Sequence, residues 1–285
     1  MSEPDSSPRE TYFKTADDIR LRELAWETDR DARAAVLIVH GFGHHAACFQ
    51  DVAALLNTHG FNCHALDLRG HGKSEGRRGH VASYEQALDD VRLFLGRVRE
   101  RIAATPLVLF GHSMGALIAA LIAAEDKSGL HGLILSSGLL RIPGHVSPLL
   151  LALAGVLGRV FPYLPVQPVD LEAISRDTSF MESMRVDSLR YFGRMNARTG
   201  LEMMKAMRRL DGCLEQIAVP LLVLHGTDDR LTDPEGSRVL HARAGSADKT
   251  VRLFDGGYHE LFNDYGKEEY LSVITEWLVA RSRMP

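Results

Sequence analysis

The chain has 285 residues, and 45% of them are hydrophobic, which is enough for a large core. Its 33 basic and 37 acidic side chains give a net charge of -4 and form no long run of either sign, so nucleic acid is not an expected partner. The three cysteines, Cys48, Cys63 and Cys213, are far apart and lack metal-ligand spacing. We expect reduced thiols, no metal and no cofactor.

The first eight residues are polar and contain two prolines. They lack the apolar run of a secretory signal peptide. Together with the pattern of cysteines, this leads us to expect a cytoplasmic protein.

Strand and helix patterns alternate along most of the chain. Residues 12–15 and 19–27 read as an opening antiparallel pair, and a helical pattern over 83–101 repeats its apolar positions every three or four residues. Further strands are expected at 36–39, 62–66, 107–110, 132–135, 221–224 and 251–254. This alternation predicts an α/β fold, with a mostly parallel sheet covered by helices on both faces.

The loop after the strand at 107–110 carries the candidate nucleophile. Gly111-His-Ser-Met-Gly115 lies between that apolar run and an alanine-rich helical stretch, 116–124. In a strand–turn–helix context, a G-x-S-x-G turn exposes the serine hydroxyl, and its glycines allow strand and helix to approach closely. We therefore predict that Ser113 is the nucleophile. The alternative is that Ser113 only caps the helix.

Attack on a carbonyl carbon places negative charge on oxygen, which needs preorganised hydrogen-bond donors. One is expected from the backbone N–H of Met114, directly after the serine. The other is expected from the loop after the strand at 36–39, His40-Gly-Phe-Gly43, where two glycines allow the backbone N–H of Phe42 to turn inward. The glycine-rich loop at 67–74 is expected to be structural.

No strand pattern is visible between Leu140 and Val219, and so long a structureless loop is improbable within a domain. We predict a helical cap over Ser113 at residues 141–210, and a core at 1–140 and 211–285. The first half of the cap is apolar, and its Leu150, Leu153 and Leu157 are expected to bind substrate.

The apolar half of the cap is too short to span a bilayer. It can line an acyl tunnel or rest peripherally on a membrane, and ordinary packing inside the protein is the alternative. The second half is rich in arginine and is expected to form a solvated helical face: Arg176, Arg185, Arg190, Arg194, Arg198, Arg208 and Arg209.

A serine nucleophile needs a base and an acid that orients the base. In the α/β-hydrolase layout the acid follows a later strand and the histidine follows the last one. The strand at 221–224 leads into Asp228 and Asp229, of which Asp229 is preferred because family spacing places the acid three residues after the glycine, and Asp228 is the alternative. The strand at 251–254 leads to His259, the expected base.

With these residues in place, the chain resembles the monoacylglycerol lipase and lysophospholipase family of serine α/β-hydrolases, and bacterial monoacylglycerol lipases most of all. The resemblance rests on the segments already described and on others along the chain: Asp67 to Ser74, His225 to Arg230, Tyr258 to Asn263, Leu164 to Gln167 and Ala173 to Asp177. It implies an α/β-hydrolase fold and cleavage of monoacylglycerol through an acyl-enzyme.

The resemblance has one local departure. Animal members carry an acidic residue and an Arg-Tyr pair after the H-G-x-G segment, where this chain has His44 and Cys48-Phe49.

A lysophospholipid or a general carboxylic ester is the second expected substrate. A prolyl-iminopeptidase-type peptidase would need acidic residues in the cap to hold an amine, and the apolar first half argues against it. A non-catalytic binding protein of this fold would lack Ser113, the acid or His259, and all three are present in this sequence.

Overall fold

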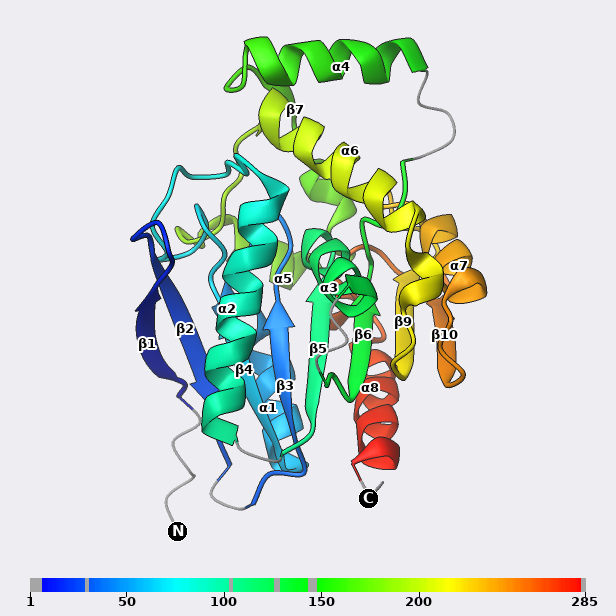
Figure 1. Ribbon diagram of the computed structural model, residues 1–285. Helices are drawn as coiled ribbons and strands as arrows, with labels where there is room; N and C mark the ends of the chain where they lie inside the picture. Colours follow the sequence, from blue (N-terminus) through cyan, green and yellow to red (C-terminus); the bar gives the residue numbers. More distant parts are fainter. Residues whose placement is uncertain (1–6, 29–30, 103–104, 126–128, 143–147, 283–285) are drawn as a thin grey trace.

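The computed structural model describes residues 7–28, 31–102, 105–125, 129–142 and 148–282. Its centre is a sheet in the order β1-β2-β4-β3-β5-β6-β9-β10 (Figure 1). The strands are β1 (Arg9–Lys14), β2 (Arg20–Trp26), β3 (Ala34–Val39), β4 (Phe61–Leu66), β5 (Leu107–His112), β6 (Gly132–Ser136), β9 (Leu221–Gly226) and β10 (Lys249–Phe254). From β4 to β10 neighbouring strands are parallel, while β1 and β2 are antiparallel.

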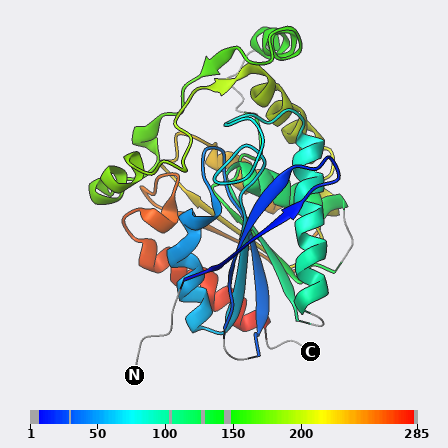
Figure 2. The same cartoon turned by 90° about the vertical axis from the view of Figure 1, so that its left-hand side faces the viewer.

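Helices cover both faces of this sheet, as the alternating pattern predicts (Figure 2). On one face lie α2 (Tyr84–Ile102), α3 (Met114–Glu125) and α7 (Pro234–Arg243), and on the other lie α1 (Gln50–Thr58) and α8 (Lys267–Arg281). Side chains alternate between the faces along a strand, so β3 sends Leu37 into one core and Ile38 into the other. The structure thus has the expected α/β fold, with a mostly parallel sheet covered by helices on both faces.

Between β6 and β9 the chain leaves the sheet and lies above the carboxyl ends of its strands (Figure 1). The helices there are α4 (Pro148–Val160), α5 (Thr178–Arg185) and α6 (Ala197–Asp211). Helices α4 and α6 pack closely, since a Cβ on Gly158 would lie 2.7 Å from Cβ of Leu201. No helix within the described ranges has the length and apolar character needed to cross a membrane.

The cap contains helices, as predicted, but also a pair of strands for which the sequence shows no pattern. Two short strands, β7 (Pro165–Gln167) and β8 (Met195–Asn196), pair antiparallel within it. Strands of three and two residues are too short to produce a readable alternation, and this pairing depends on the surrounding fold.

The parallel strands direct their carboxyl ends toward the cap. The loops after β3, β5, β6, β9 and β10 therefore meet at one edge of the sheet, which is where ligands bind in open α/β sheets. Every residue predicted for the chemical step lies on one of these loops.

Candidate active site

Ser113 lies in a tight turn between β5 and α3. Its φ of 55° is in the left-handed region, which a non-glycine residue rarely adopts. The flanking glycines are sterically required, because a Cβ on Gly111 would come within 2.4 Å of the Gly115 oxygen and a Cβ on Gly115 within 2.0 Å of the Val39 oxygen. A hydrogen bond from the Ser113 amide to the Ser136 oxygen, 2.9 Å, fixes the turn against β6. The serine is a partly exposed residue among buried neighbours.

Asp229 and His259 meet across the loops after β9 and β10. Nδ1 of His259 lies 2.7 Å from Oδ2 of Asp229, and both side chains are buried. If Nδ1 donates this bond, Nε2 is the nitrogen left to accept a proton from a serine. The neighbouring Asp228 is exposed, so Asp229 is the aspartate whose position suits an acid that orients the base.

Sequence reasoning missed two further donors to the Asp229 carboxylate. Nε2 of His225 lies 3.1 Å from Oδ2, and the hydroxyl of Thr232 donates to the same oxygen at 2.7 Å. Oδ1 accepts the backbone amides of Leu231 and Thr232 at 2.8 and 3.0 Å. The carboxylate is therefore held by bonds from five donor atoms. His225 lies at the end of β9, in the His-Gly-Thr-Asp-Asp-Arg segment, and this position beside the loop of the acid could have indicated its contact with Asp229.

These contacts set the charge of the pair. Burial raises the pKa of Asp229, but His259 and His225 outweigh it and leave the pKa far below its usual range, so the carboxylate is ionised. Burial lowers the pKa of His259, and the Asp229 charge and hydrogen bond more than offset it, so this pKa lies above its ordinary value of 6.5. The acid thus makes the imidazole a stronger base.

Ser113 and His259 line the same cavity, of about 190 Å³, at the edge of the sheet. Within the described ranges no hydrogen bond joins the serine hydroxyl to the imidazole; such contacts often tighten only when substrate binds. The cavity separates the cap from the core. Its lining is mostly apolar: Phe42, Met114, Leu139, Val169, Leu171, Ile174, Tyr191, Phe192, Met195, Met203 and Leu231.

The two predicted oxyanion donors belong to residues that flank Ser113. Phe42 and Met114 both line the cavity, and Gly41 lies so close that a Cβ there would approach Cβ of Ser113 to 2.9 Å. His40 holds the Phe42 loop, because its Nδ1 donates to the Gly41 oxygen at 2.7 Å and its Nε2 accepts the Leu68 amide at 2.9 Å. The role of the two backbone N–H groups stays a prediction.

Leu153 and Leu157 do not line this cavity. Leu153 is 52% exposed on α4, Leu157 is partly buried on the same helix, and the side chain of Leu150 lies outside the described part of the chain. Residues 167–171 and 190–195 supply the cap side of the cavity instead. Leu153 and Leu157 can therefore meet an acyl chain only beyond the cavity, and the role of the three leucines stays a prediction.

A buried charge network joins the cap to the loop of the base. Arg190 makes two bonds to Glu260, at 2.7 and 3.0 Å, and Nε2 of His44 lies 2.8 Å from the same carboxylate. Burial raises the pKa of Glu260, but Arg190 and His44 outweigh it and hold this pKa well below its usual range. The amide of Glu260 also donates to the oxygen of Ile174 in the cap, at 2.8 Å. The residue after the base is thus tied to the cap.

Two arginines contradict the expected solvated face. Arg190 is buried against Glu260, and Arg176 binds both carboxylate oxygens of Asp264 through Nε, at 3.1 and 3.0 Å. The expectation was wrong for these two because helical charge patterning does not reveal a partner elsewhere in the chain. In the loop at 67–74, Arg69 pairs with Asp17 and Asp90, which agrees with the structural role predicted for that loop.

A serine on a strained strand-to-helix turn, with a buried Asp–His pair on the loops after later strands, defines a serine hydrolase of the α/β-hydrolase class. A family model described as serine aminopeptidase, S33, matches residues 30–266, and the chain belongs to this family.

Individual relatives match over nearly the full length. The chain is 31% identical to a monoacylglycerol lipase of Mycolicibacterium smegmatis, covering 96% of this chain and 98% of the relative, and 31% identical to a human monoglyceride lipase, covering 91% and 89%. Among solved structures, a monoacylglycerol lipase of Paleococcus ferrophilus has a TM-score of 0.82 and 34% identity, covering 92% of this chain and 99% of that one.

Proposed function

We propose that the protein hydrolyses the ester bond of monoacylglycerol, releasing a fatty acid and glycerol. The geometry that carries this proposal is the 2.7 Å contact between Asp229 and His259, together with the apolar cavity that His259 and Ser113 both line. The relatives named monoacylglycerol or monoglyceride lipase support the choice of substrate.

The reaction proceeds in two halves. Ser113 Oγ attacks the ester carbonyl carbon while Nε2 of His259 takes the hydroxyl proton, and the N–H groups of Phe42 and Met114 bind the oxyanion. The intermediate collapses, His259 protonates the departing glycerol oxygen, and the acyl group remains on Ser113. Water then attacks the acyl-enzyme while Nε2 of His259 takes its proton. The bond from the acyl carbon to Ser113 Oγ breaks, His259 returns the proton to Oγ, and the fatty acid leaves.

The lining of the cavity favours an ester over the peptide suggested by the family's description. A substrate amine is positively charged and needs carboxylates to hold it. Of the described lining residues only Asp170 is acidic, and its carboxylate already lies 3.5 Å from the guanidinium of Arg230. The described lining therefore offers no unpaired carboxylate to hold a substrate ammonium group.

The size of the cavity indicates where a long acyl chain must go. Pockets for drug-sized ligands measure about 300–1,000 Å³, and this cavity is smaller at about 190 Å³. A long chain must therefore extend past it beneath the cap. A lysophospholipid stays the second candidate, supported by a 28% identical Bacillus subtilis relative named phospholipase YtpA.

We also propose that the outer face of the cap rests on a lipid surface. Leu153, Val156 and Val160 are each more than half exposed and lie three and four residues apart, which places them on one face of α4, and Phe161 extends that face. Serine at Val156, Val160 and Phe161 should abolish co-sedimentation with phosphatidylcholine vesicles. Unchanged co-sedimentation, or none with the unsubstituted protein, would refute this contact.

A panel of substrates tests the proposed activity. Purified protein should give its highest kcat/KM on a long-chain monoacylglycerol, a lower value on lysophosphatidylcholine and short nitrophenyl esters, and no turnover of aminoacyl amides. Preference for an aminoacyl amide would replace this proposal with a peptidase.

A further inference from the structure

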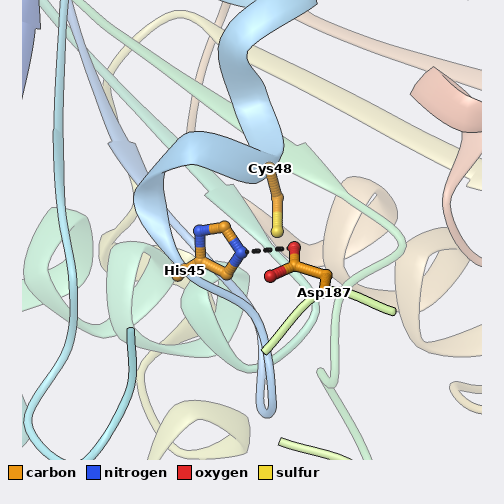
Figure 3. A group of neighbouring side chains, drawn as sticks. All are labelled: His45, Cys48 and Asp187. Atoms are coloured by element: carbon orange, nitrogen blue, oxygen red, sulfur yellow. Dashed lines mark hydrogen bonds and ion pairs between the residues drawn. The ribbon is translucent and has the colours of Figure 1, made fainter. Parts of the chain in front are cut away.

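We propose that His45, Cys48 and Asp187 form a zinc site that links the cap to the core beside the active site. One ligand atom from each residue lies within 4.8 Å of the other two (Figure 3). Nε2 of His45 is 2.8 Å from Oδ2 of Asp187, and the Cys48 side chain points toward this pair. The inference concerns a site that the ester chemistry does not use.

Local backbone structure brings the three side chains together. His45 is the N-cap of a 3-10 helix, η1 (Ala46–Phe49), and the Cys48 amide donates to the His45 oxygen at 3.1 Å. His45 and Cys48 thus lie three residues apart at the start of η1, and both side chains are directed toward Asp187 (Figure 3). Asp187 follows α5, where its Oδ1 accepts the Leu189 amide at 2.9 Å and its Oδ2 remains directed at His45.

The donor set selects the metal. An imidazole nitrogen, a thiolate sulfur and a carboxylate oxygen suit zinc, whereas magnesium and calcium prefer oxygen ligands alone. A thiolate and a carboxylate balance the two charges of the ion, and the nearby Arg190–Glu260 pair is already neutral by itself. Cys48 and Asp187 are partly exposed while His45 is buried, so the ion has a route from solvent and one firm anchor. Water would complete the tetrahedron.

Binding must displace a proton. Burial raises the pKa of the Cys48 thiol to about 12, so this thiol carries its proton at neutral pH. The S–H bond breaks, the Sγ–zinc bond forms and the proton passes to solvent. On His45 the ring proton moves from Nε2 to Nδ1. That atom is buried and has no hydrogen-bond partner within the described ranges in either state, so the exchange creates no new unpaired atom.

The ion would restrain the wall of the active site. His45 closely follows the oxyanion loop, and Asp187 belongs to the cap segment in which the Tyr191 amide donates to the Gly43 oxygen at 2.8 Å. Tyr191 lines the cavity. A metal bond between the two segments therefore adds a cross-link next to this contact, without a ligand from the Asp–His pair or Ser113.

Zinc chloride, titrated against a chelator of known affinity, tests the site on the full chain. The unsubstituted protein should bind one equivalent, and Cys48→Ala and Asp187→Asn should each weaken binding by more than about 100-fold. Cys213→Ser is the matched control, because Cys213 is a free thiol that donates to the Arg209 oxygen of α6, and it should bind as the unsubstituted protein does.

Cobalt(II) gives a readout on the unsubstituted protein, which does not depend on how the variants fold. The unsubstituted protein with one equivalent of cobalt should show the near-ultraviolet charge-transfer band of a cobalt–thiolate bond, and Cys48→Ala should lack it. Failure of the unsubstituted protein to bind zinc, a cobalt spectrum with no thiolate band, or full zinc affinity in Cys48→Ala and Asp187→Asn would each overturn the proposal.

Discussion

Asp229 controls the base of this site through the fixed position of its carboxylate. It accepts a hydrogen bond from His259 and is itself fixed by His225, Thr232 and two backbone amides. It therefore presents one oxygen to the base in one orientation. A side chain so constrained sets both the tautomer and the basicity of the imidazole.

Exchange of each aspartate for asparagine separates the two adjacent positions. Asp229→Asn should lower kcat by about 10³- to 10⁴-fold, because a neutral amide cannot stabilise the imidazolium and can favour the wrong tautomer of His259. Asp228→Asn is the matched control and should have a mild effect, since Asp228 is exposed. Steady-state rates on a soluble ester measure both. A larger loss in Asp228→Asn would mean that the acid is misplaced by one residue.

The pH profile reports on His259. Only the neutral imidazole accepts the serine proton, so kcat/KM should rise with pH through the pKa of His259, which Asp229 holds above 6.5. In Asp229→Asn the residual activity should show this rise at lower pH, because the charge that raises the pKa is gone. A profile that is flat from pH 5 to 8 would count against a histidine base.

The three residues of the chemical step could be predicted from the sequence because each follows a recognisable strand. Ser113 has glycines on both sides, and Asp229 and His259 occupy loops whose order along the chain is informative. Arg190 and Glu260 could not be paired in the same way, since they come from different parts of the chain and neither belongs to a periodic pattern. Only the fold brings them together.

At the scale of elements, the cap is held down by charge as well as by apolar packing. The Arg190–Glu260 pair is buried, and removal of one member of such a pair leaves an uncompensated charge. The base loop and the segment 171–190 therefore depend on each other for their position.

Substitution of Arg190 tests how much the buried pair with Glu260 stabilises the protein. Arg190→Met should lower the free energy of unfolding by about 3–5 kcal/mol, because Glu260 is left charged and buried. Arg230→Met, which removes an exposed pair with Asp170, should cost about 1 kcal/mol or less. Urea unfolding followed by circular dichroism compares the two. Equal stability of both variants would show that the buried pair contributes nothing.

The leucines of α4 test how far the substrate reaches. Serine at Leu150, Leu153 and Leu157 should reduce turnover of long-chain monoacylglycerol far more than turnover of a butyryl ester, since each buried methylene contributes about 0.8 kcal/mol. The chemical step should survive, because its groups lie on loops of the sheet. Parallel losses on both esters, in a protein that remains folded, would assign these leucines to ordinary packing.

The elements of the cap were the hardest to predict from the sequence. The central parallel strands β3, β5, β6 and β9 show as apolar runs because they are buried on both faces, and in each of them every residue is buried. By contrast, β7 is exposed along its whole length and begins with a proline. Such a strand has no pattern of its own and forms because β8 lies beside it.

For the whole molecule, the arrangement divides the work between two parts. The sheet fixes the serine, the acid and the base at one edge, and the cap closes an apolar cavity over them. An acyl chain can then bind under the cap while the ester bond is cleaved by the groups on the loops of the sheet.

The central claim is that Ser113 attacks the ester of a monoacylglycerol, and the rate of fatty-acid release from a long-chain monoacylglycerol tests it most directly. The unsubstituted protein should release fatty acid at a steady rate, and Ser113→Ala, folded equally well by circular dichroism, should be slower by several orders of magnitude. No release by the unsubstituted protein, or an equal rate in Ser113→Ala, would contradict the claim.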